Sequence, residues 1–320
     1  MAEAFLSETT VDDLMKVVIE NILDGGVRIT PTEGPAIELS GVLLELTNPR
    51  ARLSRTETRG KAFSCLGELC WYLAERDDLQ SIEYYVSKKY EERANDGRLL
   101  GAYGPRLFGR NGINQVGNII DTLKKKEKRD SRQMVVQLFD ANDLATKQRD
   151  VPCTCTLQFM IRRDLLILVV YMRSNDAFLG LPHDIFCFTM VQEIIAQTLD
   201  VGVGVYKHAV GSLHLYERDI DAAKAFLKEG FQPTKPIMPA MPVGDPWPNV
   251  DVLLTAEDAL RNGRPLLNET ISPLEPYWRD LIRLLQVFRS KKDNDLATIK
   301  SLRGEMSSDA YLPFIDKMIN

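Results

Sequence analysis

Hydrophobic positions recur along this chain with two different periods, which predict helices and strands respectively. Apolar residues three and four apart predict a first helix that begins at Thr10, a suitable N-cap, and ends at Gly25 and Gly26. Further apolar patterns predict helices over residues 62–74, 80–94, 113–126 and 186–199. Aliphatic runs predict strands over residues 37–46, 133–139, 155–161, 165–172 and 204–213, with a tight turn at 162–164.

The pattern changes after about residue 230. Six prolines between Pro233 and Pro248 interrupt any regular element, because proline lacks a backbone donor and has a fixed φ. Helical patterns return over residues 255–262, 276–290 and 294–303. We therefore expect a catalytic domain over residues 1–230, followed by a proline-rich connection and a helical C-terminal extension over 231–320.

Composition narrows the class of protein. The chain has 320 residues, 44% of them hydrophobic, and a formal net charge of −5, so it has no overall attraction to nucleic acid or to an anionic membrane. No apolar run approaches the roughly 20 residues that span a bilayer, and no secretory signal is evident. Five cysteines without paired Cys-x-x-Cys spacing argue against zinc and against a disulfide framework. We expect a cytoplasmic protein without a metal.

Cys153 is the first candidate for chemistry. It follows Pro152 at the start of an expected strand, although a buried cysteine is most often only a small hydrophobic residue. An arginine-rich phosphate site nearby would lower its pKa and favour the thiolate. Cys155 lies two residues further on, faces the same side if the strand is regular, and is the weaker competitor.

Polar residues in apolar surroundings are further candidates for catalytic or substrate-binding residues. Glu68 lies in an apolar helix, where it is either a solvent-reaching side chain or a proton shuttle. Arg173 and Ser174 end an apolar strand and suit a phosphate clamp, although a surface arginine is the simpler explanation. His214 and Tyr216 are two residues apart on an expected strand and share a face, either to bind a sugar hydroxyl or as half-buried core residues.

A series of ordered motifs resembles the thymidylate synthase superfamily over roughly residues 28–217. The motifs are Gly67-Glu68-Leu69-Cys70-Trp71, Gly101-Ala102-Tyr103-Gly104, Asp130-Ser131-Arg132, Pro152-Cys153, Gln158-Phe159, Arg173-Ser174-x-Asp176-x-Phe178-Leu179-Gly180-Leu181-Pro182, Ala196-Gln197 and His214-Leu215-Tyr216. The resemblance implies an α/β (α+β) fold with a large mixed sheet flanked by helices. It also implies a folate-dependent one-carbon transferase that acts as a homodimer.

The resemblance assigns a role to each candidate. The catalytic residues are Cys153, Glu68, Tyr103 and Asp184, with Cys153 adding to C6 of a pyrimidine nucleotide. Nucleotide-binding residues are Arg173 and Ser174 at the 5′-phosphate, Arg132 reaching that phosphate from the partner subunit, Arg28 as a weaker candidate there, and His214 and Tyr216 at the sugar. The co-substrate 5,10-methylenetetrahydrofolate is expected to contact Asp176 and Trp71.

Asp184 departs from the family pattern, which usually has asparagine at this position. An asparagine amide matches the carbonyl and ring N–H of uracil, whereas a carboxylate accepts from the amino group of cytosine and, if protonated, donates to its ring nitrogen. Unpaired buried polar groups on the wrong base cost roughly 1–3 kcal/mol. Asp184 therefore favours a cytosine nucleotide, CMP or dCMP, and it suits a helix N-cap before Ile185 as well.

Other departures bear on the product. Tyr90 and Arg93 stand where synthases carry tryptophans, and a more polar wall there should admit water, which favours a hydroxymethyl over a methyl product. The family's C-terminal closing segment is not recognisable in residues 311–320. Thr154 and His183 replace a histidine and a phenylalanine, and the sequence explains neither exchange.

The sequence thus predicts a CMP or dCMP 5-hydroxymethylase that works through a covalent bond from Cys153 to C6 of the base. One alternative is a thymidylate synthase that methylates dUMP, with Asp184 only capping a helix. A second is a nucleotide-binding relative without turnover, whose biological activity would survive Cys153→Ala. The choice between ribose and deoxyribose stays open, since His214 and Tyr216 address a hydroxyl that both sugars carry.

Overall fold

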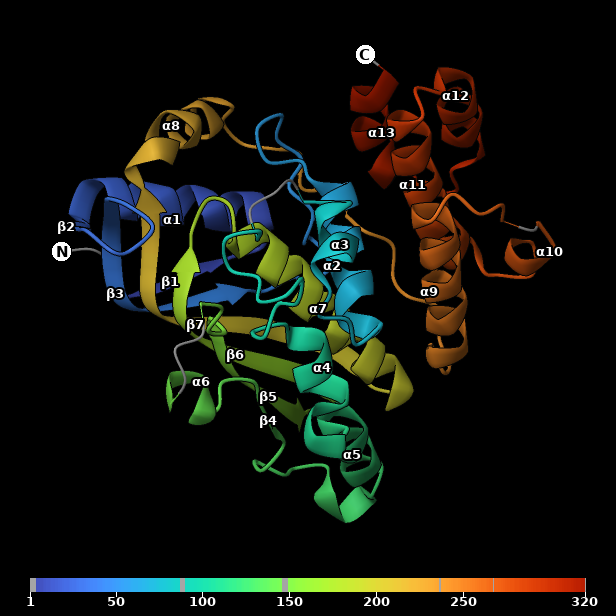
Figure 1. Cartoon of the computed structure of the whole chain (residues 1–320). Helices are drawn as coiled ribbons and strands as arrows, with labels where there is room; N and C mark the ends of the chain where they lie inside the picture. Colours follow the sequence, from blue (N-terminus) through green and yellow to red (C-terminus); the bar gives the residue numbers. More distant parts are fainter. Residues whose placement is uncertain (1–3, 87–89, 146–148, 236, 267, 320) are drawn as a thin grey trace.

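A computed structural model describes residues 4–86, 90–145, 149–235, 237–266 and 268–319. Its centre is one mixed sheet in the order β1-β3-β7-β6-β5-β4, with β2 paired to β3 (Figure 1). The strands are β1 (Phe5–Glu8), β2 (Val27–Ile29), β3 (Ala36–Leu46), β4 (Val135–Gln137), β5 (Thr154–Arg162), β6 (Leu165–Asp176) and β7 (Gly202–Tyr216). The pairs β1–β3 and β6–β7 are parallel and the others antiparallel, so the expected mixed sheet flanked by helices is confirmed.

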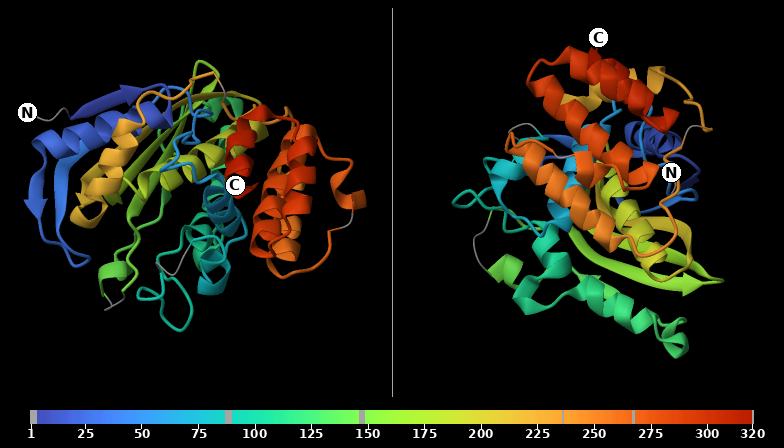
Figure 2. Two further views of the ribbon diagram at one scale, coloured as in Figure 1. Left: turned by 90° about the horizontal axis from the view of Figure 1, so that it is seen from above. Right: turned by 90° about the vertical axis from the view of Figure 1, so that its right-hand side faces the viewer.

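The helices before the proline-rich stretch are α1 (Val11–Gly25), α2 (Ala62–Leu73), α3 (Leu79–Glu83), α4 (Tyr103–Phe108), α5 (Gln115–Leu123), α6 (Asn142–Ala145), α7 (Leu181–Thr198) and α8 (Ile220–Lys228). Those after it are α9 (Trp247–Arg261), α10 (Asn268–Ile271), α11 (Pro276–Lys292), α12 (Leu296–Glu305) and α13 (Leu312–Ile319). Short 3₁₀ turns cover Arg110–Gly112, Lys126–Lys128, Glu217–Asp219 and Asp309–Tyr311. The views from above and from the side place α9 to α13 together at one end of the sheet (Figure 2).

Several local predictions are confirmed. Thr10 caps α1 by accepting a hydrogen bond from the backbone N–H of Asp13 at 3.1 Å. Strands β5 and β6 are joined by Arg163 and Asp164, whose φ angles of 51° and 55° are those of a tight hairpin turn with both central residues in the left-handed region. These features depend on neighbouring residues, so the sequence alone identifies them.

Several helix boundaries differ from the prediction, among them the start of α9 at Trp247, eight residues before the expected position 255 and inside the proline-rich stretch. The helix expected over 80–94 ends at Glu83, and of the remainder residues 87–89 lie outside the described residues. The rings of Tyr84 and Tyr85 instead pack against Phe288 of α11, with centroids 5.5 and 5.1 Å away. Helix α7 begins at Leu181, five residues earlier than predicted, because Pro182 lies in its first turn, where its missing N–H has no helical partner to lose.

The C-terminal helices share the main hydrophobic core with the sheet layer. Trp278 of α11 is buried, and Arg52 forms a fully buried ion pair with Glu193 of α7. The second oxygen of the Glu193 carboxylate accepts from the backbone N–H of Met241 at 3.0 Å. Charge, packing and a main-chain hydrogen bond therefore join the proline-rich stretch to α7.

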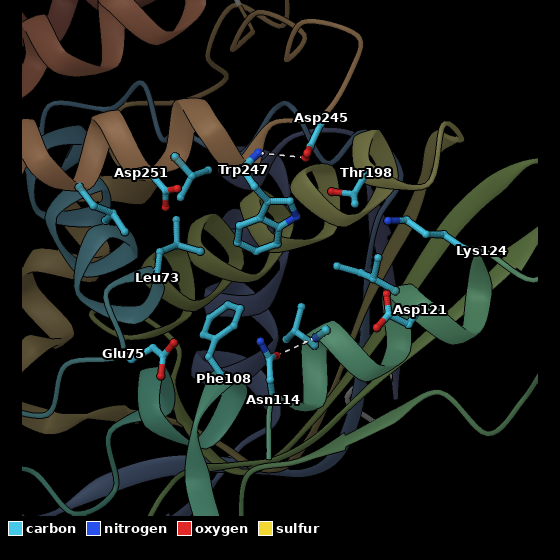
Figure 3. A pocket seen from close by; sticks show the side chains of 15 residues that line it. Leu73, Glu75, Phe108, Asn114, Asp121, Lys124, Thr198, Asp245, Trp247 and Asp251 are labelled. Atoms are coloured by element: carbon cyan, nitrogen blue, oxygen red, sulfur yellow. Dashed lines mark hydrogen bonds between the residues drawn. The ribbon is translucent and has the colours of Figure 1, made fainter. Parts of the chain in front are cut away.

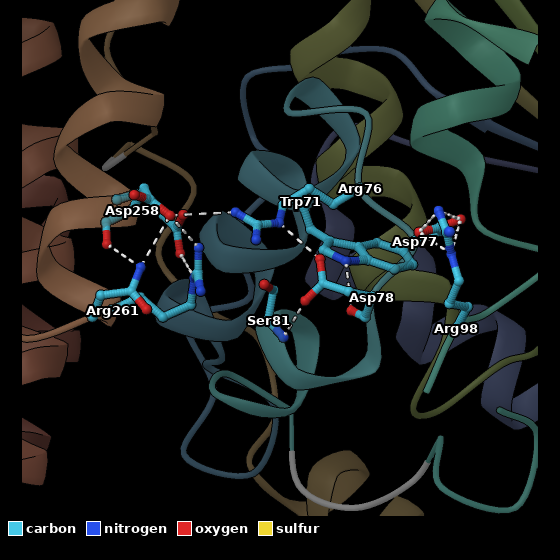
Figure 4. A network of polar contacts seen from close by, with 10 residues as sticks. Trp71, Arg76, Asp77, Asp78, Ser81, Arg98, Asp258 and Arg261 are labelled. Atoms are coloured by element: carbon cyan, nitrogen blue, oxygen red, sulfur yellow. Dashed lines mark hydrogen bonds and ion pairs between the residues drawn. The ribbon is translucent and has the colours of Figure 1, made fainter. Parts of the chain in front are cut away.

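A polar network joins α9 to the corner between α2 and α3 (Figure 4). Arg76 bonds both Asp78, at 2.8 Å, and Asp258 of α9, at 3.4 Å. Asp78 caps α3 through the backbone N–H of Ser81, and its carbonyl oxygen accepts from the indole of Trp71 at 3.1 Å. Trp71, at the end of α2, is therefore held in this corner.

Candidate active site

Cys153 lies directly before β5 and beside the end of β6. The backbone N–H of Arg173 donates to the carbonyl of Cys153 at 2.8 Å. The Arg173 guanidinium turns back over the same segment: Nε lies 3.0 Å from the carbonyl oxygen of Pro152, and Nη2 lies 2.9 Å from that of Val151. Nη2 also lies 3.8 Å from the sulfur of Cys153. The structure thus brings together the two residues that the sequence proposed as nucleophile and phosphate clamp.

The expected direction of the Cys153 pKa shift is wrong. Burial raises the pKa of the Cys153 thiol above its usual value, and the positive charges of Arg173 and Arg93 offset only part of this rise. The carboxylates of Asp184 and Asp150 act in the same direction as burial. The sequence showed the arginine but not that the fold partly buries the Cys153 side chain.

Cys155 differs from Cys153 in its position along the strand, although the charge of Arg173 acts on both thiols. A β-bulge between Thr154 and Thr156 breaks the strand alternation that would put both cysteines on one side. The thiol of Cys155 lies 4.0 Å from the carbonyl oxygen of Cys153. The sulfur of Cys153 instead lies 3.8 Å from Nη2 of Arg173. The buried hydroxyl of Thr154 has no hydrogen-bond partner among the described residues, and nothing in the structure explains this residue.

Tyr103 of α4 contacts the residue after Cys153, and Glu68 of α2 is linked to Tyr103 through Tyr72. Glu68 of α2 is buried, and its carboxylate accepts from the hydroxyl of Tyr72 at 2.9 Å. The hydroxyl of Tyr103, the first residue of α4, accepts from the backbone N–H of Thr154 at 3.1 Å. The rings of Tyr72 and Tyr103 lie 5.4 Å apart and connect the two groups. Burial of Glu68 removes the solvent-reaching alternative that the sequence left open.

Asp184 lies in the first turn of α7, not at its N-cap, and is buried. The side-chain amide of Asn175 donates to its Oδ2 at 2.8 Å. The negative charge of Asp184 raises the pKa of both Cys153 and Tyr103, with burial the larger cause for each, so the carboxylate lies within electrostatic reach of the nucleophile. The explanation of Asp184 as the N-cap is therefore wrong, because the N-cap residue of α7 is Gly180.

Three buried residues that sequence analysis missed extend this contact. Asn175 Oδ1 lies 3.1 Å from Nε2 of His208, and Nδ1 of His208 lies 2.6 Å from the hydroxyl of Tyr206. Asn175 belongs to β6, whereas His208 and Tyr206 belong to the neighbouring strand β7. The spacing of Tyr206 and His208, two residues apart on one strand, was the available signal in the sequence, since it matches the spacing of His214 and Tyr216.

The turn between β6 and α7 is organised by Asp176 and His183. One oxygen of Asp176 accepts from the backbone N–H groups of Phe178 and Leu179, each at 2.9 Å. Nδ1 of His183 lies 3.2 Å from the carbonyl oxygen of Leu179, and its Nε2 lies 2.9 Å from the hydroxyl of Ser64 on α2. His183 therefore ties the first turn of α7 to α2, which accounts for the residue that the sequence left unexplained.

His214 and Tyr216 share one face of β7, as predicted, with ring centroids 4.8 Å apart. Register pairs Asp176 with His214 and Ser174 with Ser212, so the ends of β6 and β7 carry these residues together. The hydroxyl of Tyr216 donates to Glu33 at 3.2 Å, and burial and Glu33 raise its pKa to about 12. Glu33 also pairs with Arg93. Sequence analysis missed Glu33, which lies in a loop without a motif.

Three predicted residues lie away from these contacts. Arg28 is on β2 with an 82% exposed side chain, 3.8 Å from a carboxylate oxygen of Glu217. Arg132 is exposed just before β4, and its carbonyl oxygen accepts from Gln158. Trp71 lies in the α2–α3 corner (Figure 4). The expected roles of these residues at the phosphate and the folate stay predictions.

A separate cavity of about 370 Å³ lies between α4, α5, α7 and α9, and its walls include Phe108, Trp247 and Val250 (Figure 3). Asp121, Asp245 and Asp251 also line it, and Lys124 lies on the same side as Asp121. The sequence-predicted site residues are not among those that line it. It is therefore distinct from the group around Cys153.

Comparison with known proteins agrees with this geometry. A family model described as thymidylate synthase matches residues 17–243, which is most of the chain. The chain belongs to the thymidylate synthase family. A curated thymidylate synthase from Mycoplasma mobile is 34% identical over 130 residues, which cover 41% of this chain and 42% of that protein. The thymidylate synthase family comprises folate-dependent one-carbon transferases that bind a pyrimidine nucleotide, and the match spans less than half of this relative's length.

Two further observations concern the part of the chain that the structure describes. None of its helices combines the length and the apolar character that a membrane crossing requires. Its histidine, cysteine and carboxylate side chains form no cluster of three or more that is arranged to hold a metal ion.

Proposed function

We propose that the chain is a pyrimidine nucleotide C5 hydroxymethyltransferase that converts CMP or dCMP with 5,10-methylenetetrahydrofolate. The observation that carries this proposal is the buried carboxylate of Asp184, which lies within electrostatic reach of Cys153 and accepts a hydrogen bond from Asn175. A carboxylate at this place offers acceptors to the amino group of cytosine, whereas it opposes the carbonyl oxygen of uracil. Because the site is buried, the mismatch costs roughly 1–3 kcal/mol.

The residues around Cys153 support covalent catalysis. In the proposed reaction the Cys153 thiolate forms a bond to C6 of the pyrimidine, and the C5–C6 double bond shifts its electron pair to C5. Arg173, 3.8 Å from the sulfur, stabilises the thiolate against its burial. Tyr103 contacts the residue after Cys153, and Glu68 is linked to Tyr103 through Tyr72, so in the proposed reaction these two residues move protons to and from the base.

The remaining nucleotide contacts follow from the ends of β6 and β7. Ser174 and Arg173 close one strand, and His214 and Tyr216 lie on the next, so a nucleotide whose base reaches Cys153 passes its sugar and phosphate between them. In the proposed complex Tyr216 exchanges its bond with Glu33 for the sugar hydroxyl. Both sugars carry that hydroxyl, so the proposal covers CMP and dCMP.

Asp176 has the chemistry that a folate site requires. One oxygen of Asp176 holds the turn, whereas Oδ2 is buried and has no hydrogen-bond partner among the described residues. A buried acceptor without a donor fits the ring N–H groups of a reduced pterin. Asp176 would hold the folate there, with Trp71 as the second predicted contact. When bound, the folate supplies a one-carbon unit at the oxidation level of formaldehyde.

Tyr90 and Arg93 support the proposal that water, and not a hydride, reacts in the final step. Burial raises the pKa of Tyr90, and the charges of Glu68 and Asp184 add to this, so its hydroxyl stays protonated beside the two carboxylates. Arg93, paired with Glu33, contributes a positive charge within reach of Cys153. A polar wall can orient water toward the one-carbon unit on C5, which gives a hydroxymethyl group, whereas an apolar wall excludes water.

The second candidate is methylation of dUMP, and the matching relative named thymidylate synthase favours it. Under this alternative Asp184 is protonated or reoriented when uracil binds. Product analysis separates the two candidates, because methylation releases dihydrofolate and hydroxymethylation releases tetrahydrofolate.

We also propose a homodimer that forms through the more exposed face of the central sheet. Phe5, Val135, Leu165 and Tyr171 are 44–49% exposed, and strand register places all four on that face. Burying them against a second copy would remove this apolar patch from water. Arg132 lies beside the same face, next to Gln158, as its predicted role across a dimer requires. Residues 1–230 would be the catalytic domain and 231–320 its extension.

The test is an assay of the purified chain with CMP, dCMP and dUMP, each with 5,10-methylenetetrahydrofolate. The proposal predicts 5-hydroxymethylcytosine nucleotide together with tetrahydrofolate. Cys153→Ala, with Cys155→Ala as its matched control, assigns the nucleophile. Formation of dTMP and dihydrofolate from dUMP, with no cytosine product, would instead establish the alternative.

A further inference from the structure

A chain of buried hydrogen bonds leads from Asp184 to Tyr206 on a strand of the central sheet. Asn175 donates through Nδ2 to Asp184 at 2.8 Å, and its Oδ1 lies 3.1 Å from Nε2 of His208. Nδ1 of His208 lies 2.6 Å from the hydroxyl of Tyr206. Tyr206 and His208 are fully buried and Asn175 nearly so. The mechanism proposed above assigns no catalytic or binding role to these three residues.

The direction of each hydrogen bond is fixed by its neighbour. A carboxylate oxygen only accepts, so the NH₂ group of Asn175 points at Asp184 and its carbonyl oxygen points at His208. That carbonyl needs a donor, which places the imidazole proton on Nε2. Nδ1 is then an acceptor, and the hydroxyl of Tyr206 donates to it. The relay therefore runs from Tyr206 as the first donor to Asp184 as the last acceptor.

The environment of His208 favours this single arrangement. Burial lowers the pKa of His208 to about 3, so the ring is neutral at neutral pH and has one donor and one acceptor. A doubly protonated ring would need acceptors on both sides, and the tyrosine hydroxyl would have to reverse. Because alternative patterns leave a buried polar group unpaired, the relay has one low-energy state.

We propose that Asn175, His208 and Tyr206 are positioning residues that determine which pyrimidine base the site accepts. They hold Oδ2 of Asp184 as an acceptor and fix the orientation of its carboxyl plane toward the base. A hydrogen bond donated to a carboxylate stabilises its charged form, which is the form that accepts from the cytosine amino group. This inference rests on the proposed function, since it concerns the specificity of that same site.

The relay also predicts what an amide at position 184 does. In Asp184→Asn the NH₂ of Asn175 still requires an acceptor, so the carbonyl oxygen of the new amide turns toward Asn175. Its NH₂ group then faces the base and donates to the carbonyl oxygen of uracil. The same three residues would therefore orient either side chain, and the residue at 184 would select the base.

The experiment measures kcat/KM for dCMP and for dUMP, and nucleotide binding by calorimetry, in the full chain and three variants. Tyr206→Phe removes only the first hydroxyl of the relay, and Asn175→Ala removes the donor to Asp184. The cytosine-to-uracil ratio is expected to fall severalfold in Tyr206→Phe and about tenfold or more in Asn175→Ala. Tyr277→Phe is the matched control, because it removes a buried hydroxyl that contacts Met190 of α7 at 3.7 Å, and its ratio should equal that of the wild type.

A second readout does not depend on turnover. The chain has three histidines, so the imidazole nitrogens of His208 can be assigned by NMR. The inference predicts a neutral ring with its proton on Nε2 in the wild type, and an altered Nδ1 resonance in Tyr206→Phe.

The outcomes separate this inference from the proposed function. A wild type that prefers cytosine, together with an unchanged ratio in Tyr206→Phe and Asn175→Ala, overturns the inference and leaves the function standing. A proton on Nδ1 of His208 also overturns it. A wild type that binds or converts only dUMP overturns both.

Discussion

Arg173 holds both the sulfur of Cys153 and the main chain that carries it. Its Nη2 lies 3.8 Å from the sulfur and 2.9 Å from the carbonyl oxygen of Val151. The same guanidinium therefore positions the cysteine and offsets part of the cost of burying a thiolate. One side chain thus supplies both the positive charge near the sulfur and the hydrogen bonds that position Cys153. Substitutions of Arg173 can therefore measure what each contributes to the reactivity of the thiol.

The first prediction concerns the reactivity of that thiol. Arg173→Gln removes the positive charge while keeping hydrogen-bond donors, so the pKa of Cys153, already raised by burial, rises further. In a Cys155→Ser background, the rate of alkylation by iodoacetamide at pH 8 should fall severalfold. Arg129→Gln, on the exposed surface beside Asp164, is the control and should leave the rate unchanged. An equal rate in both variants would contradict the electrostatic role of Arg173.

The second prediction concerns the packing behind Glu68. A Cβ atom at Gly67 would lie 2.1 Å from the ring of Tyr85, which is itself packed on Phe288. Gly67→Ala should therefore lower the free energy of unfolding by about 1–3 kcal/mol and reduce kcat by displacing Glu68. Gly304→Ala, where no atom lies within 4 Å of the added Cβ, is the matched control. Urea unfolding and steady-state kinetics measure the two effects, and full stability in Gly67→Ala would show that this contact is misplaced.

The third prediction is a pH dependence of stability. His208 has a pKa of about 3 in the folded chain, lowered by burial, and about 6.5 when unfolded. Between these values only the unfolded state binds the proton, so acidification favours unfolding. From pH 7 to pH 5 the free energy of unfolding should fall about 2 kcal/mol more in the wild type than in His208→Gln. Parallel pH profiles of the two proteins in urea titrations would show that His208 is not buried and neutral.

The fourth prediction concerns the link to the C-terminal helices. Glu193→Ala leaves the buried guanidinium of Arg52 without its counter-ion and removes the acceptor for Met241. The cost should be about 3–5 kcal/mol of unfolding free energy. Asp316→Ala breaks the exposed pair with Arg303 and should leave the denaturant midpoint unchanged. If both variants lose equal stability, the buried pair has no special role.

Sequence reasoning succeeded where the determinants are local. The Arg162–Leu165 hairpin, the cap at Thr10 and the strands that carry Arg173 and His214 depend on neighbouring residues and on side-chain alternation. The ordered motifs then placed the family, because their order along the chain requires no knowledge of packing.

Sequence reasoning failed where contacts between distant segments determine the structure. Just past the end of α3, Tyr84 and Tyr85 pack against Phe288, about 200 residues further along, and local sequence does not show this contact. The relay from Tyr206 to Asp184 includes a contact between Asn175 and His208, which are more than 30 positions apart in sequence, so the spacing of Tyr206 and His208 on one strand does not by itself reveal it. The direction of the Cys153 pKa shift depends on burial by the whole fold, which a local count of arginines does not measure.

The most direct test of the account compares kcat/KM for dCMP and dUMP in the wild type and in Asp184→Asn. The account predicts that the wild type prefers cytosine and that Asp184→Asn shifts the ratio toward uracil by at least tenfold, because an amide donates where the carboxylate accepted. A ratio that stays the same in Asp184→Asn would show that this carboxylate does not recognise the base, and the proposed function would be wrong.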